Sequence, residues 1–199
     1  MWISWKHQET DYSFPLGFEN KVEIFYDQIL GWQLHIADLI ANGGMTFESP
    51  GGKPAHETPS IEHSGFAVLH ISLSYFELIG SLLAPSKGYG ERFKVGVRAI
   101  LPGLLKGDAS DEALLERMYK GARCGLYHFG RTRLRVGLGQ PDDGSPIEYD
   151  PKTRELSISP QRLPKALKAH LEQFKAGLLN PTNHALRQEF EKQFDMGFE

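Results

Sequence analysis

Residues 64–84 read SGFAVLHISLSYFELIGSLLA, and this stretch is about as long as a bilayer-spanning helix. His70 and Glu77 lie near its middle, however, and an acidic residue at the centre of a spanning helix costs about 2.5 kcal/mol or more on insertion scales. We therefore expect residues 62–83 to form a buried core helix that ends before Pro85, in a protein that does not have a membrane as its partner.

A second helix is predicted on the N-terminal side of this stretch. Apolar residues recur at steps of three and four within residues 20–42, directly after Asn20, which is a good N-cap residue. Residues 43–61 are rich in glycine and proline, a composition that favours a surface loop. Residues 1–19 hold several aromatic side chains among glycine and proline, and we expect an irregular arm that packs on the body of the protein.

Two more helical patterns follow the apolar stretch. The first, in residues 91–105, contains Pro102 and is expected to bend or end there. The second begins at the acidic residues of 108–112, which suit the first turn of a helix, and continues to residue 128. Four helices within residues 20–130 predict a mainly α protein with an up-and-down helical bundle.

The pattern changes after residue 130. Apolar and polar residues alternate in 132–138, and Asp150-Pro-Lys-Thr153 is a good type I turn between two further strand-like segments. We expect residues 131–159 to form a small antiparallel β insert. Pro160 and Pro181 each follow a capping residue and predict the start of two C-terminal helices within 160–199.

The amino-acid composition of the chain is typical of a folded protein. The chain has 199 residues, of which 40% are hydrophobic and 24% charged, and this length is compatible with a single domain. The one cysteine, Cys124, excludes an intramolecular disulfide. The first residues do not show the pattern of an export signal, so we expect a cytoplasmic protein.

Basic residues are concentrated in one part of the chain. The net charge of −3 argues against a protein that binds nucleic acid through bulk charge. Residues 117–135, however, contain six basic and no acidic residues, so this window carries +6 and the rest of the chain −9. Such segregation suits an anionic partner. The six residues are Arg117, Lys120, Arg123, Arg131, Arg133 and Arg135.

Arg131, Arg133 and Arg135 alternate along the chain. On a strand, their guanidinium groups would project from one face, as contacts to phosphate groups require, and Lys120 would add to the same basic surface. The alternative is a solvated strand face whose charges protect a sheet edge from aggregation.

The same window contains Arg123-Cys-Gly-Leu-Tyr-His128. An Arg followed a few residues later by His, late in a helix of a small bundle, resembles the signature of the HEPN superfamily, and MYKGARCGLYHFG is similar to stretches of bacterial HEPN-like proteins. The resemblance covers the four helices predicted within residues 20–130. It implies a homodimer, a metal-independent endoribonuclease acting on RNA, no cofactor, and an antitoxin-like protein as an inhibitory partner.

The resemblance implies a role for each residue of the pair. His128 would transfer protons, since imidazole titrates near neutral pH, and Arg123 would stabilise charge on the phosphate. Five residues on an ideal helix separate two side chains by about 140°. Distortion near Gly125, or the motif of a second protomer, must therefore bring the two groups together. The residue after the Arg is often polar in active members, whereas here it is Cys124, so the alternative is an inactive HEPN-like module that binds RNA, nucleotide or a partner protein.

Three residues are candidates for supporting roles. His70 and Glu77 lie seven residues apart on one stripe of the apolar helix, where Glu77 would orient His128 or Arg123. The alternative for Glu77 is a structural partner that holds an arginine in place. Tyr127 would stack on an RNA base, or would belong to the core or a dimer interface. The chain has no HExxH or paired CxxC motif, and no metal site is expected.

Overall fold

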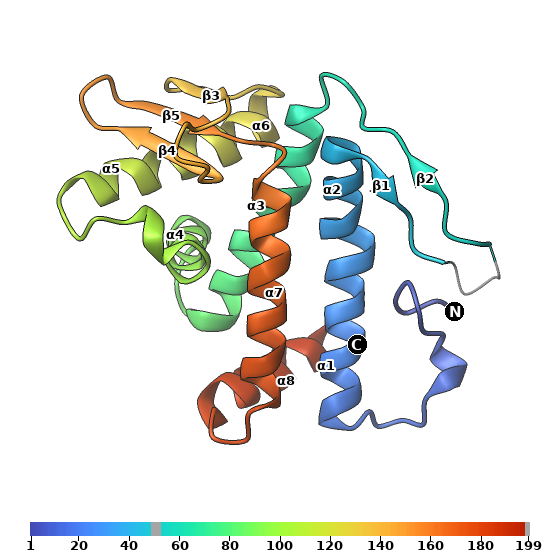
Figure 1. The fold of residues 1–199 in the computed structure, drawn as a ribbon. Coiled ribbons are helices and arrows are strands. Elements are labelled where there is room, and N and C mark those ends of the chain that lie inside the picture. Colours follow the sequence, from blue (N-terminus) through green and yellow to red (C-terminus); the bar gives the residue numbers. More distant parts are fainter. Residues whose placement is uncertain (49–52, 198–199) are drawn as a thin grey trace.

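The computed structural model describes residues 1–48 and 53–197, which form a mainly helical protein with a small β-sheet at one end (Figure 1). This confirms the predicted mainly α class with a small β part. The helices are α1 (Phe18–Ile29), α2 (His35–Asn42), α3 (Gly65–Leu83), α4 (Tyr89–Ile100), α5 (Ser110–Glu116), α6 (Cys124–Phe129), α7 (Leu163–Leu179) and α8 (His184–Met196). The strands are β1 (Gly44–Met45), β2 (Glu57–Thr58), β3 (Val136–Leu138), β4 (Ile147–Asp150) and β5 (Glu155–Ile158).

Helix α3 is the central helix of the fold. It contacts α2, α4, α6, α7 and α8, so it is covered on several sides, which explains why it is apolar nearly all round. Within the described residues, α3 alone has the length and composition to cross a membrane, and half of its apolar window is buried inside the protein. The same hydrophobic core contains residues of α7 and α8, so the two C-terminal helices belong to the packing around α3.

Two of the predicted helices are wound more widely in their middle. Residues 20–42 form α1 and α2, joined by a π-helical turn at Leu30–Leu34. Residues 108–128 form α5 and α6, joined by a π-helical segment at Arg117–Arg123. The third pattern ends as its proline predicts, because α4 stops at Ile100 and a 3-10 turn follows.

Two glycines allow α3 and α4 to touch along their backbones. A Cβ atom on Gly80 of α3 would lie 1.7 Å from the carbonyl oxygen of Arg92 in α4. A Cβ atom on Gly96 of α4 would lie 1.8 Å from the carbonyl oxygen of Phe76 in α3. Any larger residue at either position forces the two helices apart.

The β insert differs from the prediction in two ways. Its strand order is β3-β5-β4, and β3 runs parallel to β5, so the sheet is mixed rather than antiparallel. The strand predicted at 132–138 is reduced to β3, because Leu134 and Arg135 have φ angles of 55° and 56°, in the left-handed region. The predicted turn after Asp150 is confirmed, and the Asp150 carboxylate accepts hydrogen bonds from the Lys152 N–H and the Thr153 hydroxyl.

Other boundaries move by a few residues. Helices α7 and α8 begin at Leu163 and His184, a few residues after the predicted starts. A turn precedes each helix: Ser159 Oγ accepts the N–H of Arg162 at 3.2 Å, as a capping residue does, and the Asn180 side chain accepts the N–H of Thr182. The loop predicted at 43–61 contains a two-stranded ladder of β1 and β2, and its residues 49–52 lie outside the described part.

The N-terminal arm packs on the helices as predicted, although two of its aromatic side chains remain exposed. Trp5 stacks on Phe47, with ring centres 4.2 Å apart, and lies so close to Gly31 that a Cβ atom there would be 1.9 Å from the indole ring. Trp2 and Phe14 are exposed to solvent.

A buried hydrogen bond links α3 to α7. Tyr75 is fully buried, and its hydroxyl lies 2.9 Å from Nδ1 of His170. Because the buried phenol needs an acceptor for its proton, we assign Tyr75 as the donor and His170 as the neutral tautomer with its proton on Nε2. Burial lowers the pKa of His170 below its ordinary value of 6.5.

We therefore expect the protein to lose stability in mild acid through His170. Since its pKa is lower in the folded state, the unfolded chain binds the proton first, so the free energy of unfolding falls as the pH drops below about 6.5 toward the folded pKa. His170→Asn keeps an acceptor but does not titrate there. Urea unfolding at several pH values should show a smaller loss of stability for this variant than for the wild type between about pH 7.5 and 5.5. Equal losses would contradict the assignment.

Candidate functional site

The predicted motif lies where the π-helical segment ends and α6 begins. The π-helical segment ends at Arg123, and α6 carries Tyr127 and His128 before Gly130 terminates the helix with a left-handed backbone. Irregular π turns of this kind occur frequently at functional sites. The π-helical segment and the sequence motif therefore indicate the same candidate site, since both contain Arg123.

Arg123 is held from two sides. Its Nη2 and Nε lie 2.8 and 3.1 Å from the same carboxylate oxygen of Glu77 in α3. Its guanidinium carbon lies 4.3 Å from the centre of the Tyr127 ring, within the range of a cation–π contact. Burial alone lowers the pKa of Arg123, but its bonds to Glu77 outweigh this effect and raise that pKa above its ordinary value. The guanidinium is a fixed cation in a fixed orientation.

The structure thus brings together four of the predicted site residues. The ring of His70 lies 5.3 Å from that of Tyr127, so His70 and Glu77 of α3 face Tyr127 and Arg123 across one contact between helices. The alternative that Glu77 holds an arginine in place describes this pair correctly. Both side chains of the ion pair are 19% exposed, so the cluster lies at the edge of the core and reaches the surface.

His128 lies apart from this cluster. Its side chain is exposed, and within the described residues its one recorded contact is an edge contact with Phe129, at 6.4 Å between ring centres. The expectation that distortion near Gly125 brings His128 to Arg123 is wrong for the single chain, because α6 is regular at that position and the five-residue step separates the two side chains.

Gly125 does not distort α6, but allows a close contact between the helix and the loop that follows it. A Cβ atom on Gly125 would lie 2.8 Å from the carbonyl oxygen of Arg131, and one on Gly121 would lie 2.8 Å from that of Arg133. The N–H of Arg133 donates to the carbonyl of Gly121 at 2.9 Å. The two glycines, one helical turn apart, therefore let the loop after α6 dock on the helix. Their four-residue spacing is the feature of the sequence that indicates this docking.

The prediction that three arginines share one strand face is wrong. Arg131 and Arg133 lie in a loop, and Arg135 follows the left-handed Leu134. The Nη1 of Arg135 donates to the carbonyl of Thr153 at 2.8 Å, whereas Arg133 lies over the Phe129 ring at 4.3 Å. Arg131 is exposed and has no recorded partner in the described part of the chain.

The +6 window is partly neutralised within the fold. Lys120 pairs with Glu116, and Arg123 pairs with Glu77. Arg117 and Arg135 keep their charge, although each donates to a backbone carbonyl. Because the acidic partners come from outside the sequence window, the charge counted along the chain overstates the charge in space. Within the described residues, Arg131 and Arg133 are the basic residues of the window whose side chains have neither an acidic partner nor a hydrogen bond to the backbone.

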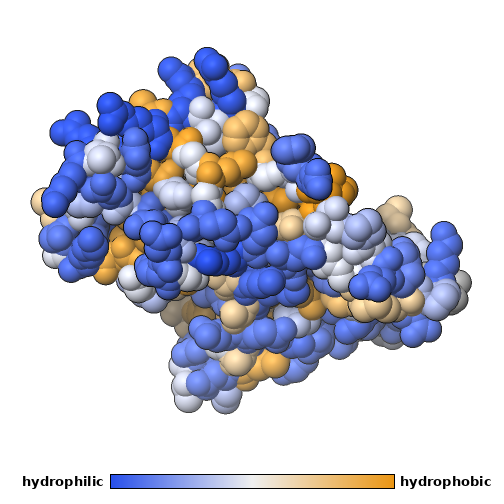
Figure 2. Space-filling model, turned by 45° about the horizontal axis from the view of Figure 1, so that its top comes forward, coloured by the Kyte–Doolittle hydropathy of each residue, from blue (hydrophilic) through white to orange (hydrophobic). Residues whose placement is uncertain are grey.

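Exposed aromatic rings accompany these two arginines. Tyr127 and Phe129 are 49% and 58% exposed, and Leu134 is 50% exposed. The view that brings the top of Figure 1 forward shows apolar patches among hydrophilic residues on this side of the molecule (Figure 2). We call Tyr127, His128, Phe129, Arg131 and Arg133 the α6 surface; it combines cations with rings that can stack.

Thiol chemistry and metal binding have less support at this site. The pKa of Tyr119 is raised by burial and then by the neighbouring thiol of Cys124, so the cysteine side chain faces Tyr119. Within residues 1–48 and 53–197, no group of three or more His, Cys, Asp and Glu side chains has the arrangement of a metal site.

Comparison of the chain with protein-family models, with curated proteins and with solved structures finds no match.

Proposed function

We propose that the chain is a metal-independent endoribonuclease of the HEPN type, located in the cytoplasm, in which Arg123 binds the phosphate to be cleaved and His128 transfers a proton. The observation that carries the proposal is the cluster of Arg123, Glu77, Tyr127 and His70, which holds the guanidinium in place. The exposed imidazole of His128 follows Tyr127 in α6 but lies apart from the cluster. A cation held in a fixed orientation stabilises charge that develops in a transition state without reorganising.

Each group has a chemical role in this proposal. Glu77 binds Nε and Nη2 of Arg123, which leaves Nη1 to contact a phosphate oxygen. His128 acts on the 2′-hydroxyl or on the leaving oxygen, as general base or acid. Since Arg123 and His128 of one chain do not touch, a homodimer supplies the partner group, and the α6 surface forms part of the interface or of the RNA path. An antitoxin-like protein that covers this surface would inhibit the enzyme.

The proposal is tested with purified protein and structured RNA in EDTA. We expect cleavage that survives chelation and leaves 2′,3′-cyclic phosphate and 5′-hydroxyl ends, because the 2′-hydroxyl is the nucleophile. RNA with 2′-deoxy substitutions should not be cut at the substituted positions. Absence of cleavage for every RNA tried would overturn the proposal.

The second candidate is a catalytically inactive module that binds RNA through the α6 surface. The observation that favours it is the engagement of Arg123 by both Glu77 and Tyr127, since a guanidinium used in this way supports the fold. Exposed Phe129 with Arg133 over its ring still offers a stacking platform for single-stranded RNA.

For either candidate, RNA binding should weaken steeply with salt because bound protein displaces counterions from the phosphates. Arg133→Ala is expected to lower the slope of log K against log salt by about one. Lys192→Ala, at an exposed position on α8 at the other end of the molecule, serves as the control and should leave the slope unchanged (Figure 1). Fluorescence anisotropy with labelled single-stranded RNA measures both, and a binding constant independent of salt would exclude the α6 surface as an RNA site.

A further inference from the structure

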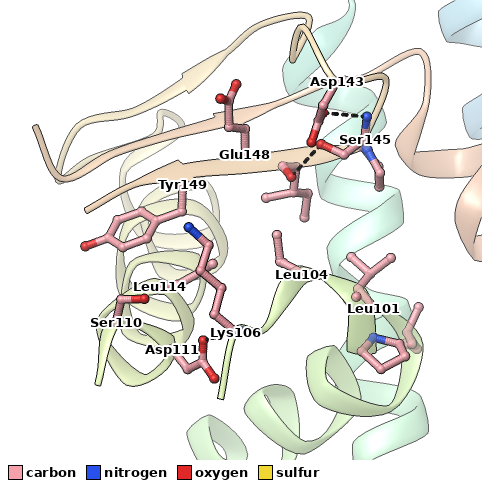
Figure 3. Close-up of a pocket in the computed structure, with 15 residues that line it drawn as sticks. Leu101, Leu104, Lys106, Ser110, Asp111, Leu114, Asp143, Ser145, Glu148 and Tyr149 are labelled. Atoms are coloured by element: carbon pink, nitrogen blue, oxygen red, sulfur yellow. Dashed lines mark hydrogen bonds between the residues drawn. The ribbon is translucent and has the colours of Figure 1, made fainter. Parts of the chain in front are cut away.

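A cavity of about 530 Å3 lies away from the α6 surface, between β4 and the segment that connects α4 to α5 (Figure 3). Its floor is apolar and is made by Leu101, Leu104, Leu114 and Ile147. The size and the apolar lining are those of a binding cleft. None of the residues proposed above for RNA cleavage lines this cavity.

The strand that borders this cavity has a free edge. In the order β3-β5-β4, strand β4 pairs with β5 on one side, and no strand of residues 1–48 or 53–197 pairs with it on the other. The carbonyl of Pro146 accepts the N–H of Ser159 at 2.9 Å, which sets the hydrogen-bonding pattern of the antiparallel pair. Backbone groups alternate in direction along such a strand, so those of Ile147 and Tyr149 point away from β5.

Most of these outward groups have no partner within the described residues. The carbonyl of Ile147 accepts the hydroxyl of Ser145 at 2.9 Å, whereas its N–H and both backbone groups of Tyr149 are unpaired. A row of this kind is a template for an added strand.

The cavity reaches this free edge. Ile147, Glu148 and Tyr149 all line it, although the side chains of consecutive strand residues point to opposite faces of a sheet. A cavity lined by all three lies along the strand edge, where an added peptide would pass. Figure 3 shows Tyr149 and Lys106 at one end of the cavity and the leucines below β4.

The residues around the cavity carry an excess of negative charge. Three acidic residues, Asp111, Asp143 and Glu148, line it together with one basic residue, Lys106. The Asp111 and Asp143 carboxylates accept backbone N–H groups of neighbouring turns. The excess of negative charge favours a basic partner.

We propose that the free edge of β4 binds an extended segment of a partner protein in which apolar and basic residues alternate. The segment adds a strand to β4 through the outward backbone groups of Ile147 and Tyr149. Its apolar side chains enter the cavity on the side of Ile147, and its basic side chains lie on the opposite face, where Glu148 is exposed.

The probe is acetyl-Lys-Leu-Lys-Leu-Lys-amide, titrated into the isotope-labelled full chain and followed by NMR. We expect chemical-shift changes that centre on β4 and slower hydrogen exchange at the amides of Ile147 and Tyr149. The same peptide with N-methyl groups on alternate residues cannot form the strand bonds, and its Asp-Leu counterpart has the wrong charge. Each should bind at least about tenfold more weakly, a difference of about 1.4 kcal/mol.

Glu148→Lys is the matched variant, because Glu148 is exposed and its substitution does not disturb the core. It should weaken the Lys-Leu peptide severalfold and strengthen the Asp-Leu peptide. Equal binding of the N-methylated peptide would reduce the site to an apolar cavity without strand addition. That result, shift changes that centre elsewhere, or no binding at millimolar peptide would overturn the proposal. Because no RNA is present, these outcomes are independent of the ribonuclease proposal.

Discussion

Gly96→Ala is expected to destabilise the protein by about 3 kcal/mol or more, although it adds one methyl group, because overpacking of a tight interior contact costs about 1–3 kcal/mol and more where backbone must move. The new Cβ atom would lie 1.8 Å from the Phe76 carbonyl oxygen, so α3 and α4 must separate. Separation also opens space beside Phe76 and Phe93, which are both fully buried. For a chain of this size, the melting temperature should fall by roughly 6–12 °C.

A double mutant tests the cause. Gly80→Ala creates the same kind of conflict from the opposite helix, at 1.7 Å from the Arg92 carbonyl oxygen. Because one separation of α3 from α4 relieves both conflicts, the double variant should lose clearly less stability than the sum of the two single variants. Gly103→Ala is the control, since a Cβ atom there meets nothing within 4 Å. Urea unfolding measures all four variants and the wild type. Additive losses, or a Gly96→Ala protein as stable as the control, would contradict the proposed contact.

The sequence predicted the helices, but it did not predict the close backbone contact between α3 and α4. Helical periodicity is local, so the apolar steps within 20–42 and the acidic start of 108–128 were sufficient to predict helices at these positions. The close approach of Gly80 and Gly96 depends on two segments whose relative orientation is decided by the whole core. Gly121 and Gly125 are similar, because their partner is a loop that follows α6.

The candidate site also has features that the sequence predicted and features that it did not. Glu77 and Arg123 were predictable as partners, since a carboxylate within an apolar helix needs a cation. The alternation of Arg131, Arg133 and Arg135 suggested a strand. The left-handed backbone at Leu134 and Arg135, which interrupts that strand, cannot be predicted from the alternation. Charge along the chain was also misleading, because Glu77 neutralises Arg123 from a position 46 residues away.

His128→Ala is expected to reduce RNA cleavage by about 10²–10⁴-fold, the usual contribution of a general acid or base. RNA affinity should change little, because an exposed imidazole is a small part of the α6 surface. His184→Ala, at an exposed position on α8, is the matched control and should cleave as the wild type does. Single-turnover assays in EDTA measure the rates. A His128→Ala protein with full activity would remove His128 from the mechanism.

Mixing two inactive variants tests how His128 meets Arg123. Arg123→Gln removes the guanidinium and keeps an amide that can donate to Glu77, so the fold around α3 is preserved. If each site combines Arg123 of one protomer with His128 of the other, a mixed dimer of Arg123→Gln and His128→Ala contains one intact site. Random exchange of protomers then restores about a quarter of the wild-type rate, because half of the dimers are mixed and each has one of two sites. If both groups act within one chain, mixing restores nothing, and the contact between them must form by a rearrangement of α6 on RNA binding.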